Sequence, residues 1–347
     1  MNHKLDDELN DQLEDLGYAT PYIRNAPLPR PHKIKKNASG HARLPQLVTE
    51  MAAQNDDRGA FDFSYQASRY ERGWLTGSLG GFFEAHWFDD VLRMIKGGKE
   101  ASVYLCKANP TTQADYLAAK VYRPRQFRNL KKDYLYREGR QNLDSNGEVV
   151  WEERMLRAIH NKTAYGQELL HTSWIEYEFL ALQVLHQAGA DTPIPYTRGN
   201  NAILMEYIGD LDRSAPTLND VDLSTSEARP LFQRVLHNIE LMLANNHIHG
   251  DLSAFNILYW EGEITLIDFP QTMHPEQSPN TFQIFARDVK RVCEYFARQG
   301  VRSNPHKIAA DLWTAYRHRL VPEVDPHFLD DQSESDRQYW EKQAKNK

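Results

Sequence analysis

Two short stretches in the second half of the chain carry side chains whose types and spacing could do chemistry. They are HGDLSAFN, residues 249–256, and IDFPQ, residues 267–271. Between them, ILYWEGEITLIDF alternates apolar and polar residues on both sides of a Glu-Gly pair, which is typical of a β-hairpin. A tight hairpin brings Asn256, where the first strand begins, close to Asp268, where the second strand ends.

Asn256 and Asp268 together offer the hard oxygen atoms that Mg²⁺ prefers when it also binds phosphate; Mn²⁺ is a second candidate. Asp251 precedes Asn256 by five residues and is free to face an incoming hydroxyl group. Phosphoryl transfer depends mainly on positioning and on neutralisation of charge by the metal. The spacing therefore predicts a phosphotransferase site, with Asp251 and Asp268 catalytic and with Asn256 and Asp268 as metal ligands.

A nucleotide kinase also needs a lysine on a strand after a glycine-containing loop, and a helical glutamate that holds this lysine. Lys120 in LAAKVY and Glu178 in WIEYEFLAL occur upstream in that order. Glu176 is the competing partner, but it lies about 200° round the helix from Glu178, so only one of the two can face the lysine. The apolar neighbours of Glu178 favour it.

Hydrophobic periodicity predicts the elements that must position these residues. A glycine turn in KGGKEASVYLCKA, residues 96–108, leads into an alternation at Val103 and Leu105, and with YLAAKVY, residues 116–122, this predicts a β-hairpin. A buried strand is predicted at 201–209. The stretch 82–95, FFEAHWFDDVLRMI, has the apolar spacing of an amphipathic helix. Further helices are predicted over residues 174–189, 228–246 and 280–300.

Composition narrows the class of protein. A chain of 347 residues, 41% of them hydrophobic, is long enough for two lobes, and a net charge of -7 argues against a surface made wholly for nucleic acid. Cys106 and Cys293 form no CxxC motif, so neither a disulfide framework nor a cysteine zinc site is expected, and a reducing cytoplasm fits best. The acidic opening differs from a signal peptide, and no apolar run approaches the ~20 residues of a membrane span, so we expect no membrane partner.

Two segments are basic. Residues 24–43 fall within 1–60, which we interpret as a disordered tail, and a polar tail is predicted over 322–347. Residues 120–140 carry eight Lys and Arg against two acidic residues. Such segments can bind RNA phosphates or an acidic protein surface, or they can be solvated loops with no partner.

The chain resembles the RIO family of atypical protein kinases over about residues 74–300. The resemblance is carried by GGKEASVY at 97–104, HGDLSAFN, IDFPQ, and MEYIG at 205–209. It implies an α+β, two-lobed protein-kinase-like fold of the reduced RIO type. A small β-rich N-lobe would occupy 61–208 and a mostly helical C-lobe 209–321.

The resemblance also implies a site for Mg-ATP and the activity of a non-specific serine/threonine protein kinase that also phosphorylates itself. Its usual work in small-subunit maturation implies ribosomal RNA or a pre-ribosomal particle as a partner. The nucleotide-binding residues implied are Gly98, Lys99, Glu100, Ser102, Val103, Lys120, Glu178, Met205, Glu206 and Ile208.

Departures from ordinary kinases keep alternatives open. Gly250 stands where an HRD motif has arginine, no Ala-Pro-Glu follows Asp268, and residues 1–73 are too proline-rich for the winged-helix domain of one RIO branch. One alternative is an ATPase assembly factor in which Asp268 is transiently phosphorylated. Another is a small-molecule kinase of the aminoglycoside or choline type, which the roughly 40 residues between Gly209 and His249 disfavour.

Overall fold

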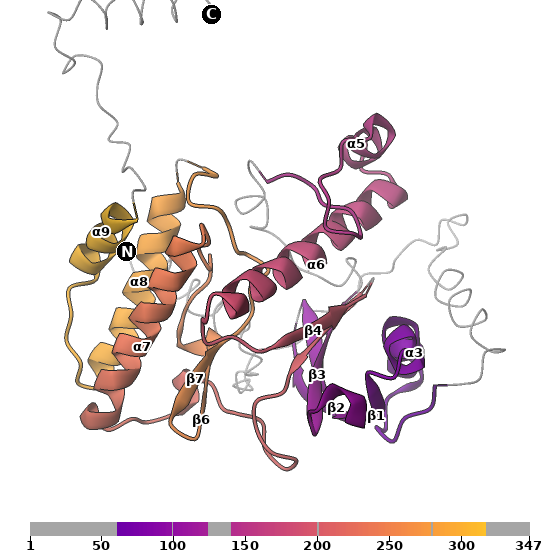
Figure 1. Ribbon diagram of the computed structural model, residues 1–347, viewed down its shortest axis with the longest axis horizontal. Helices are drawn as coiled ribbons and strands as arrows, with labels where there is room; N and C mark the ends of the chain where they lie inside the picture. The colour runs from indigo at the N-terminus through magenta and orange to yellow at the C-terminus, as the bar shows by residue number, and fades with distance from the viewer. Residues whose placement is uncertain (1–60, 99, 124–139, 200, 279, 317–347) are drawn as a thin grey trace, which may run out of the picture. The chain divides into compact units, whose positions relative to one another are not determined.

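The computed structural model describes residues 61–98, 100–123, 140–199, 201–278 and 280–316 (Figure 1). The predicted tails, the basic segment 24–43 and most of the basic segment 120–140 lie outside these residues. Within them, no helix is both long and apolar enough to cross a membrane.

The N-lobe is built on a five-stranded antiparallel sheet in the order β1-β2-β3-β5-β4. Helix α3, Arg69–Glu84, lies beside the sheet (Figure 1). The predicted hairpin and buried strand are confirmed as β2, β3 and β5. The strands are β1 Phe88–Gly97, β2 Ala101–Ala108, β3 Tyr116–Tyr122, β4 Pro195–Arg198 and β5 Ala202–Glu206.

The two faces of this sheet bury different sets of side chains. Tyr104 and Cys106 of β2 belong to the core that includes the buried residues of α3. Leu105 lies between them in the sequence and belongs to a second core with Tyr122 and Trp174. The alternation follows from the two-residue period of a strand, and it decides which side chains can face a ligand bound against the second face.

The prediction of an amphipathic helix over residues 82–95 is wrong. Helix α3 ends at Glu84, His86 takes a left-handed φ of 58°, and β1 follows. The register of β1 against β2 shifts three times, so Phe88, Val91 and Met94 are paired with Ala108, Cys106 and Tyr104. Each shift adds a residue to β1, and its core-facing side chains therefore recur every three residues, the spacing that imitates a helix.

Two helices precede β4. They are α5, Glu153–His160, and α6, Ala164–Gln187. The helix predicted over 174–189 is confirmed in α6, which begins ten residues earlier, where the Thr163 side chain accepts the Gly166 N–H. Gly189 follows the helix with a φ of 82°, the left-handed conformation that glycine adopts at helix ends.

The C-lobe is mainly helical, with α7, α8 and α9 side by side (Figure 1). The helices predicted over 228–246 and 280–300 and the hairpin predicted after residue 256 are confirmed. These elements share one large apolar core with the end of α6. Their bounds are α7 Thr225–Ala244, β6 Ile257–Trp260, β7 Glu263–Leu266, α8 Thr281–Arg298 and α9 Pro305–Ala315.

Candidate active site

Lys120 lies between two carboxylates that come from different parts of the chain. Its Nζ is 2.5 Å from Glu178 Oε1 and 2.5 Å from Asp268 Oδ1. Strand β3 presents the lysine, α6 presents the glutamate, and Asp268 follows β7. The lysine–glutamate pair expected from the sequence is therefore present, and it is joined directly to the expected metal ligand.

Glu176 points to a different side of α6 from Glu178. Its carboxylate forms an ion pair with Arg198 of β4. Burial raises the pKa of Glu176, and the guanidinium of Arg198 opposes that change. The two glutamates of α6 thus serve separate cations, and only Glu178 reaches Lys120.

The charges of Lys120, Glu178 and Asp268 stabilise one another. Burial on its own would lower the pKa of Lys120, but the carboxylates of Asp268 and Glu178 outweigh burial and raise it above its ordinary value. Burial would likewise raise the pKa of Asp268, yet the Lys120 ammonium outweighs that effect and lowers it. Both groups are therefore charged at neutral pH, as phosphate and metal binding require.

Tyr122 holds the second oxygen of Glu178, a contact that the sequence analysis missed. Its hydroxyl donates to Glu178 Oε2 at 2.5 Å, its ring is fully buried, and it meets Trp174 edge-on with the centroids 4.9 Å apart. The Lys120 ammonium lies 5.5 Å from the ring centroid. The position of Tyr122 two residues after Lys120, on the same face of β3, is the signal that could have identified it.

We expect Tyr122→Phe to weaken ATP binding as well as folding. The change leaves a buried carboxylate oxygen without its donor, which costs about 1–3 kcal/mol of stability. Tyr104→Phe is the matched control, because Tyr104 is equally buried and donates to Glu71 Oε1 at 2.8 Å on the α3 face. The midpoint temperature of thermal unfolding should fall for both variants, and the Kd for ATP should rise only for Tyr122→Phe. Equal ATP affinity in the two variants would contradict this role.

The glycine-containing turn joins β1 to β2. The Gly98 N–H donates to the Ala101 carbonyl at 2.9 Å, and a Cβ on Gly98 would lie 2.8 Å from that oxygen, so the turn needs glycine there. Val103 is paired with Lys120 and shares its face, whereas the side chain of Ser102 is buried on the Tyr104 face. The Ser102 side chain is therefore turned away from Lys120, and only its backbone remains available for the predicted nucleotide contact. Lys99 lies outside the described residues, and Glu100 accepts the Arg123 N–H through its carbonyl.

The end of β5 and the residues that follow it carry Met205, Glu206 and Ile208, which the family resemblance implied as nucleotide-binding residues. Met205 is buried on the second face of the sheet with Tyr122. The Glu206 N–H donates to Ile194, and the Ile208 carbonyl accepts the Ala215 N–H. These bonds do not involve the Glu206 carbonyl or the Ile208 N–H, an acceptor and a donor of the kind that an adenine edge requires.

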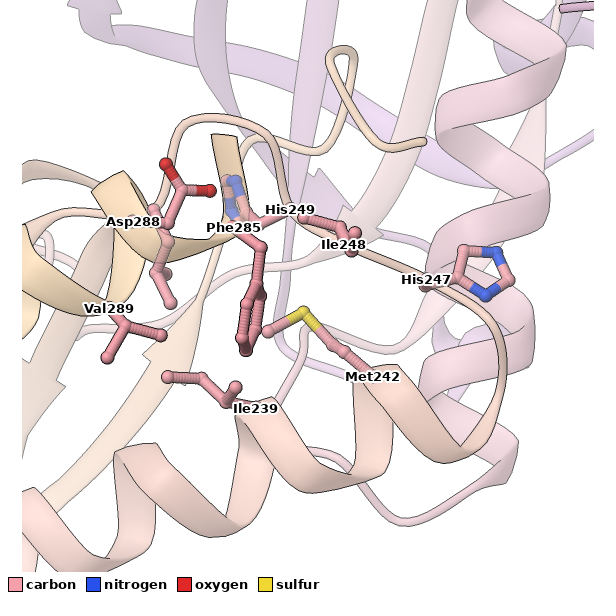
Figure 2. A pocket seen from close by; sticks show the side chains of 9 residues that line it. Ile239, Met242, His247, Ile248, His249, Phe285, Asp288 and Val289 are labelled. Atoms are coloured by element: carbon pink, nitrogen blue, oxygen red, sulfur yellow. The ribbon is translucent and has the colours of Figure 1, made fainter. Parts of the chain in front are cut away.

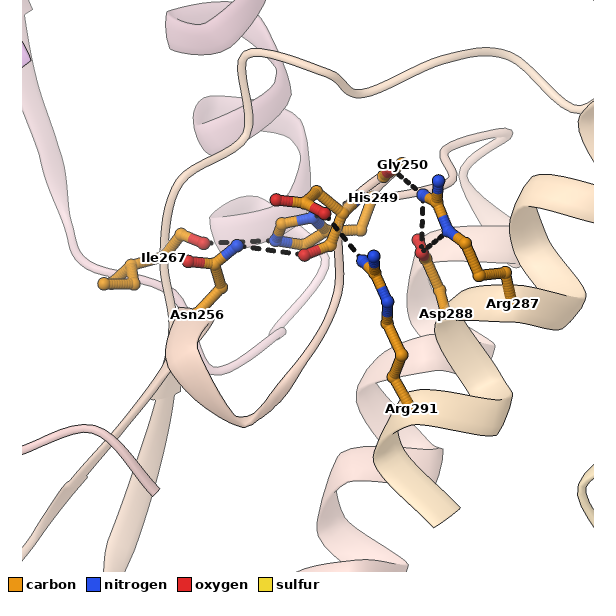
Figure 3. A network of polar contacts seen from close by, with 8 residues as sticks. His249, Gly250, Asn256, Ile267, Arg287, Asp288 and Arg291 are labelled. Atoms are coloured by element: carbon orange, nitrogen blue, oxygen red, sulfur yellow. Dashed lines mark hydrogen bonds and ion pairs between the residues drawn. The ribbon is translucent and has the colours of Figure 1, made fainter. Parts of the chain in front are cut away.

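The predicted catalytic loop, residues 249–256, is held against the loop that carries Asp268. A short β-bridge pairs Ile248 with Met273, and the His249 Nε2–H donates to the Ile267 carbonyl at 3.1 Å while Nδ1 accepts the Asp251 N–H (Figure 3). The His249 ring also packs on buried Phe269, with centroids 4.7 Å apart. His249 therefore braces the loop.

Asn256 and Asp268 fit a hard divalent cation. The Asn256 Nδ2 donates to the Asp251 carbonyl at 2.9 Å, which leaves Oδ1 as the metal-facing atom (Figure 3). Asn256 ends a 3₁₀ turn, Ala254–Asn256, and its carbonyl accepts the Ile267 N–H, so the backbones meet next to Asp268. Asp268 lies two residues beyond β7 with a φ of 71°, and its Oδ1 accepts a hydrogen bond from Lys120 Nζ. Mg²⁺ prefers oxygen ligands such as an amide oxygen and a carboxylate, with phosphate oxygens completing its coordination shell.

Gly250 cannot be replaced by any other residue without local distortion. Its φ is 82°, and an added Cβ would lie 2.3 Å from the Gln271 carbonyl oxygen. The absence of a side chain at this position, noted from the sequence, is thus a condition for the close approach of the two loops.

Gly250→Ala is expected to lower the free energy of unfolding by at least about 1–3 kcal/mol, because the cost of the left-handed φ and the cost of the clash with the Gln271 carbonyl add to each other. Gly77→Ala provides the control. Gly77 lies within α3 with open space around its Cβ, so alanine there should raise stability by up to about 1 kcal/mol. Chemical denaturation measures both, and an unchanged midpoint for Gly250→Ala would contradict the tight contact.

Helix α8 supports the catalytic loop from the other side through three residues that the sequence analysis did not single out. Arg287 donates to the Gly250 carbonyl and to Asp288 Oδ1, and Arg291 Nη1 is 2.7 Å from Asp251 Oδ1 (Figure 3). The sequence held a signal for the two arginines, because Arg287 and Arg291 are four residues apart and therefore share one face of a predicted helix.

Asp288 is almost fully buried at one end of a small pocket behind the catalytic loop (Figure 2). Burial raises its pKa, and Arg287 opposes that change. Apolar side chains, among them Met242 of α7 and Phe285 of α8, line most of the pocket. The pocket contains none of the residues expected to bind nucleotide, so it belongs to the support of the loop.

Known proteins with kinase names are similar to this chain in sequence. RIO-type serine/threonine-protein kinase Rio1 of Haloferax volcanii is 32% identical over 214 residues, 59% of this chain and 63% of that protein. Serine/threonine-protein kinase RIO1 of Homo sapiens is 29% identical over 208 residues, 60% of this chain and 33% of that protein. The matched part thus spans less than two thirds of either relative.

Among solved structures, the Rio2 kinase–ADP/Mg²⁺–phosphoaspartate complex from Chaetomium thermophilum covers 80% of this chain and 76% of its own, with 18% identity and a TM-score of 0.49. The family model described as the RIO domain matches residues 102–308, a range that holds Lys120, Glu178 and both catalytic-site loops. The chain has the α+β, protein-kinase-like fold expected from its sequence, and it belongs to the RIO domain family.

Proposed function

We propose that this protein is an ATP- and Mg²⁺-dependent protein kinase of the RIO type that transfers the γ-phosphate of ATP to a protein serine, including its own. The observation that carries the proposal is the position of Lys120 between Glu178 and Asp268, with the Asp251 and Asn256 loop braced beside it. The kinase names of the relatives support the same activity.

Each residue has a role in this proposal. Lys120, held by Glu178, orients the α- and β-phosphates, and the backbone of the turn at 97–102 covers them. Asn256 Oδ1 and Asp268 would hold Mg²⁺, which neutralises charge on the phosphates when bound. Asp251 orients the attacking hydroxyl and accepts its proton.

The test follows ³²P from γ-labelled ATP in the presence of Mg²⁺, with and without added protein substrates. We expect acid-stable label on serine, both in the protein itself and in the added substrates. This label should be lost when the metal is chelated. Label that appears only as inorganic phosphate, with turnover raised by ribosomal subunits, would instead support the ATPase assembly factor.

A small-molecule kinase is the third outcome that this test separates. Transfer to an aminoglycoside or to choline, with no label on protein, would identify it. Contact with ribosomal RNA through residues 24–43 and 120–140 stays a prediction from their basic composition, as does use of Mn²⁺. A cytoplasmic location likewise stays a prediction from the cysteine content.

A further inference from the structure

The carboxylate of Asp251 is held by a cation from outside its own loop. Arg291, on α8, places Nη1 2.7 Å from Asp251 Oδ1, and the figure shows the guanidinium directed at that oxygen (Figure 3). One helical turn earlier, Arg287 donates hydrogen bonds to the Gly250 carbonyl and to Asp288. The two arginines therefore hold adjacent residues of the catalytic loop, one through the backbone and one through the side chain.

The loop itself cannot supply this cation. Gly250 precedes Asp251, and its left-handed φ and the 2.3 Å approach of the Gln271 carbonyl oxygen exclude a side chain. A guanidinium that is to reach the Asp251 carboxylate must therefore come from a neighbouring element. Helix α8 provides it at Arg291.

We propose that Arg291 is a positioning residue for phosphoryl transfer, an inference that rests on the proposed role of Asp251. By binding Oδ1, Arg291 fixes the orientation of the carboxylate, so that Oδ2 would be the oxygen that accepts the proton of the substrate hydroxyl. Asn256 holds the Asp251 carbonyl at 2.9 Å, so side chain and backbone of Asp251 are both held. A small displacement of a group that must meet a hydroxyl is enough to slow transfer strongly.

The ion pair is suited to catalysis more than to folding. The side chains of Arg291 and Asp251 are 40% and 41% exposed, and exposed ion pairs contribute little to stability. Removal of the guanidinium should therefore change the rate of transfer far more than the melting temperature. ATP binding should be unaffected, because Arg291 contacts neither Lys120 nor Asp268 in the described structure.

The test compares Arg291→Ala and Arg291→Lys with Lys290→Ala. Lys290 is the adjacent residue of α8, and it pairs with Glu294 at 3.6 Å on an exposed surface, so it matches Arg291 in charge and helix position. For Arg291→Ala we expect kcat to fall about 10- to 100-fold, with the ATP Kd and the Tm close to those of the wild type. Arg291→Lys should keep an intermediate kcat, and Lys290→Ala should match the wild type.

Each other outcome overturns the inference. An Arg291→Ala protein with wild-type kcat, or one that loses ATP binding and kcat together, would show that Arg291 does not position Asp251. A wild-type protein that transfers no phosphate at all would overturn the proposed function and this inference together. An active wild type with an equally active Arg291→Ala variant overturns this inference alone.

Discussion

Replacing Asp251 with asparagine is expected to reduce phosphotransfer by about 10²- to 10⁴-fold, the range that a positioned general base contributes. Asparagine has nearly the same size but cannot accept the proton of the attacking hydroxyl. ATP affinity should stay near that of the wild type, because the Asp251 side chain pairs with Arg291 on α8 while Lys120 is held by Glu178 and Asp268. Steady-state ³²P transfer and ATP titration measure the two effects separately.

Asp311→Asn is the matched control for this experiment. Asp311 is exposed on α9, so the same change removes one negative charge far from the candidate active site. Its kcat should equal that of the wild type. An Asp251→Asn protein that transfers phosphate as fast as the Asp311→Asn control would contradict the assignment of Asp251.

Replacing Lys120 with methionine is expected to abolish detectable ATP binding and to lower the free energy of unfolding by about 3–5 kcal/mol. The variant leaves the Glu178 carboxylate, whose side chain is 1% exposed, without its cation, and an uncompensated buried charge is costly. Asp268 loses its partner as well, but its side chain is only partly buried, 44% exposed against 1% for Glu178, so the loss costs less there. Nucleotide titration and chemical denaturation at neutral pH measure the two losses.

Lys107→Met supplies the comparison. Lys107 is exposed on β2, in the same sheet, so its replacement changes charge and size in the same way without touching Glu178. Both binding and stability should stay close to wild-type values in this control. A Lys120→Met protein that binds ATP with wild-type affinity would refute the role of Lys120 in holding the phosphates.

Much of the site could be predicted because its residues obey short-range rules. Asn256 and Asp268 are separated by a two-strand hairpin, which fixes their distance, and Glu176 and Glu178 differ by a known rotation about one helix. The kinase template called for a glutamate partner of Lys120, the rotation showed that only one of the two can face it, and the apolar neighbours of Glu178 favoured that residue. These inferences needed only the order and local spacing of the residues.

The features that escaped prediction depend on contacts between distant segments or on local irregularity. Three register shifts in β1 gave its core-facing residues a helical spacing, and no sequence period distinguishes that strand from a helix. The contact between Arg291 and Asp251 joins residues 40 apart, and the sequence alone does not say which face of α8 meets the loop. The burial of the Ser102 side chain was likewise decided by strand register.

The most direct test of the central claim is the chemical identity of the phosphate that the wild-type protein transfers from γ-³²P-ATP. We expect label on serine that survives acid and hydroxylamine, and that is lost in Asp251→Asn while ATP still binds. A protein labelled only by a hydroxylamine-sensitive acyl phosphate that requires Asp268 and persists in Asp251→Asn would contradict transfer to a hydroxyl group through Asp251.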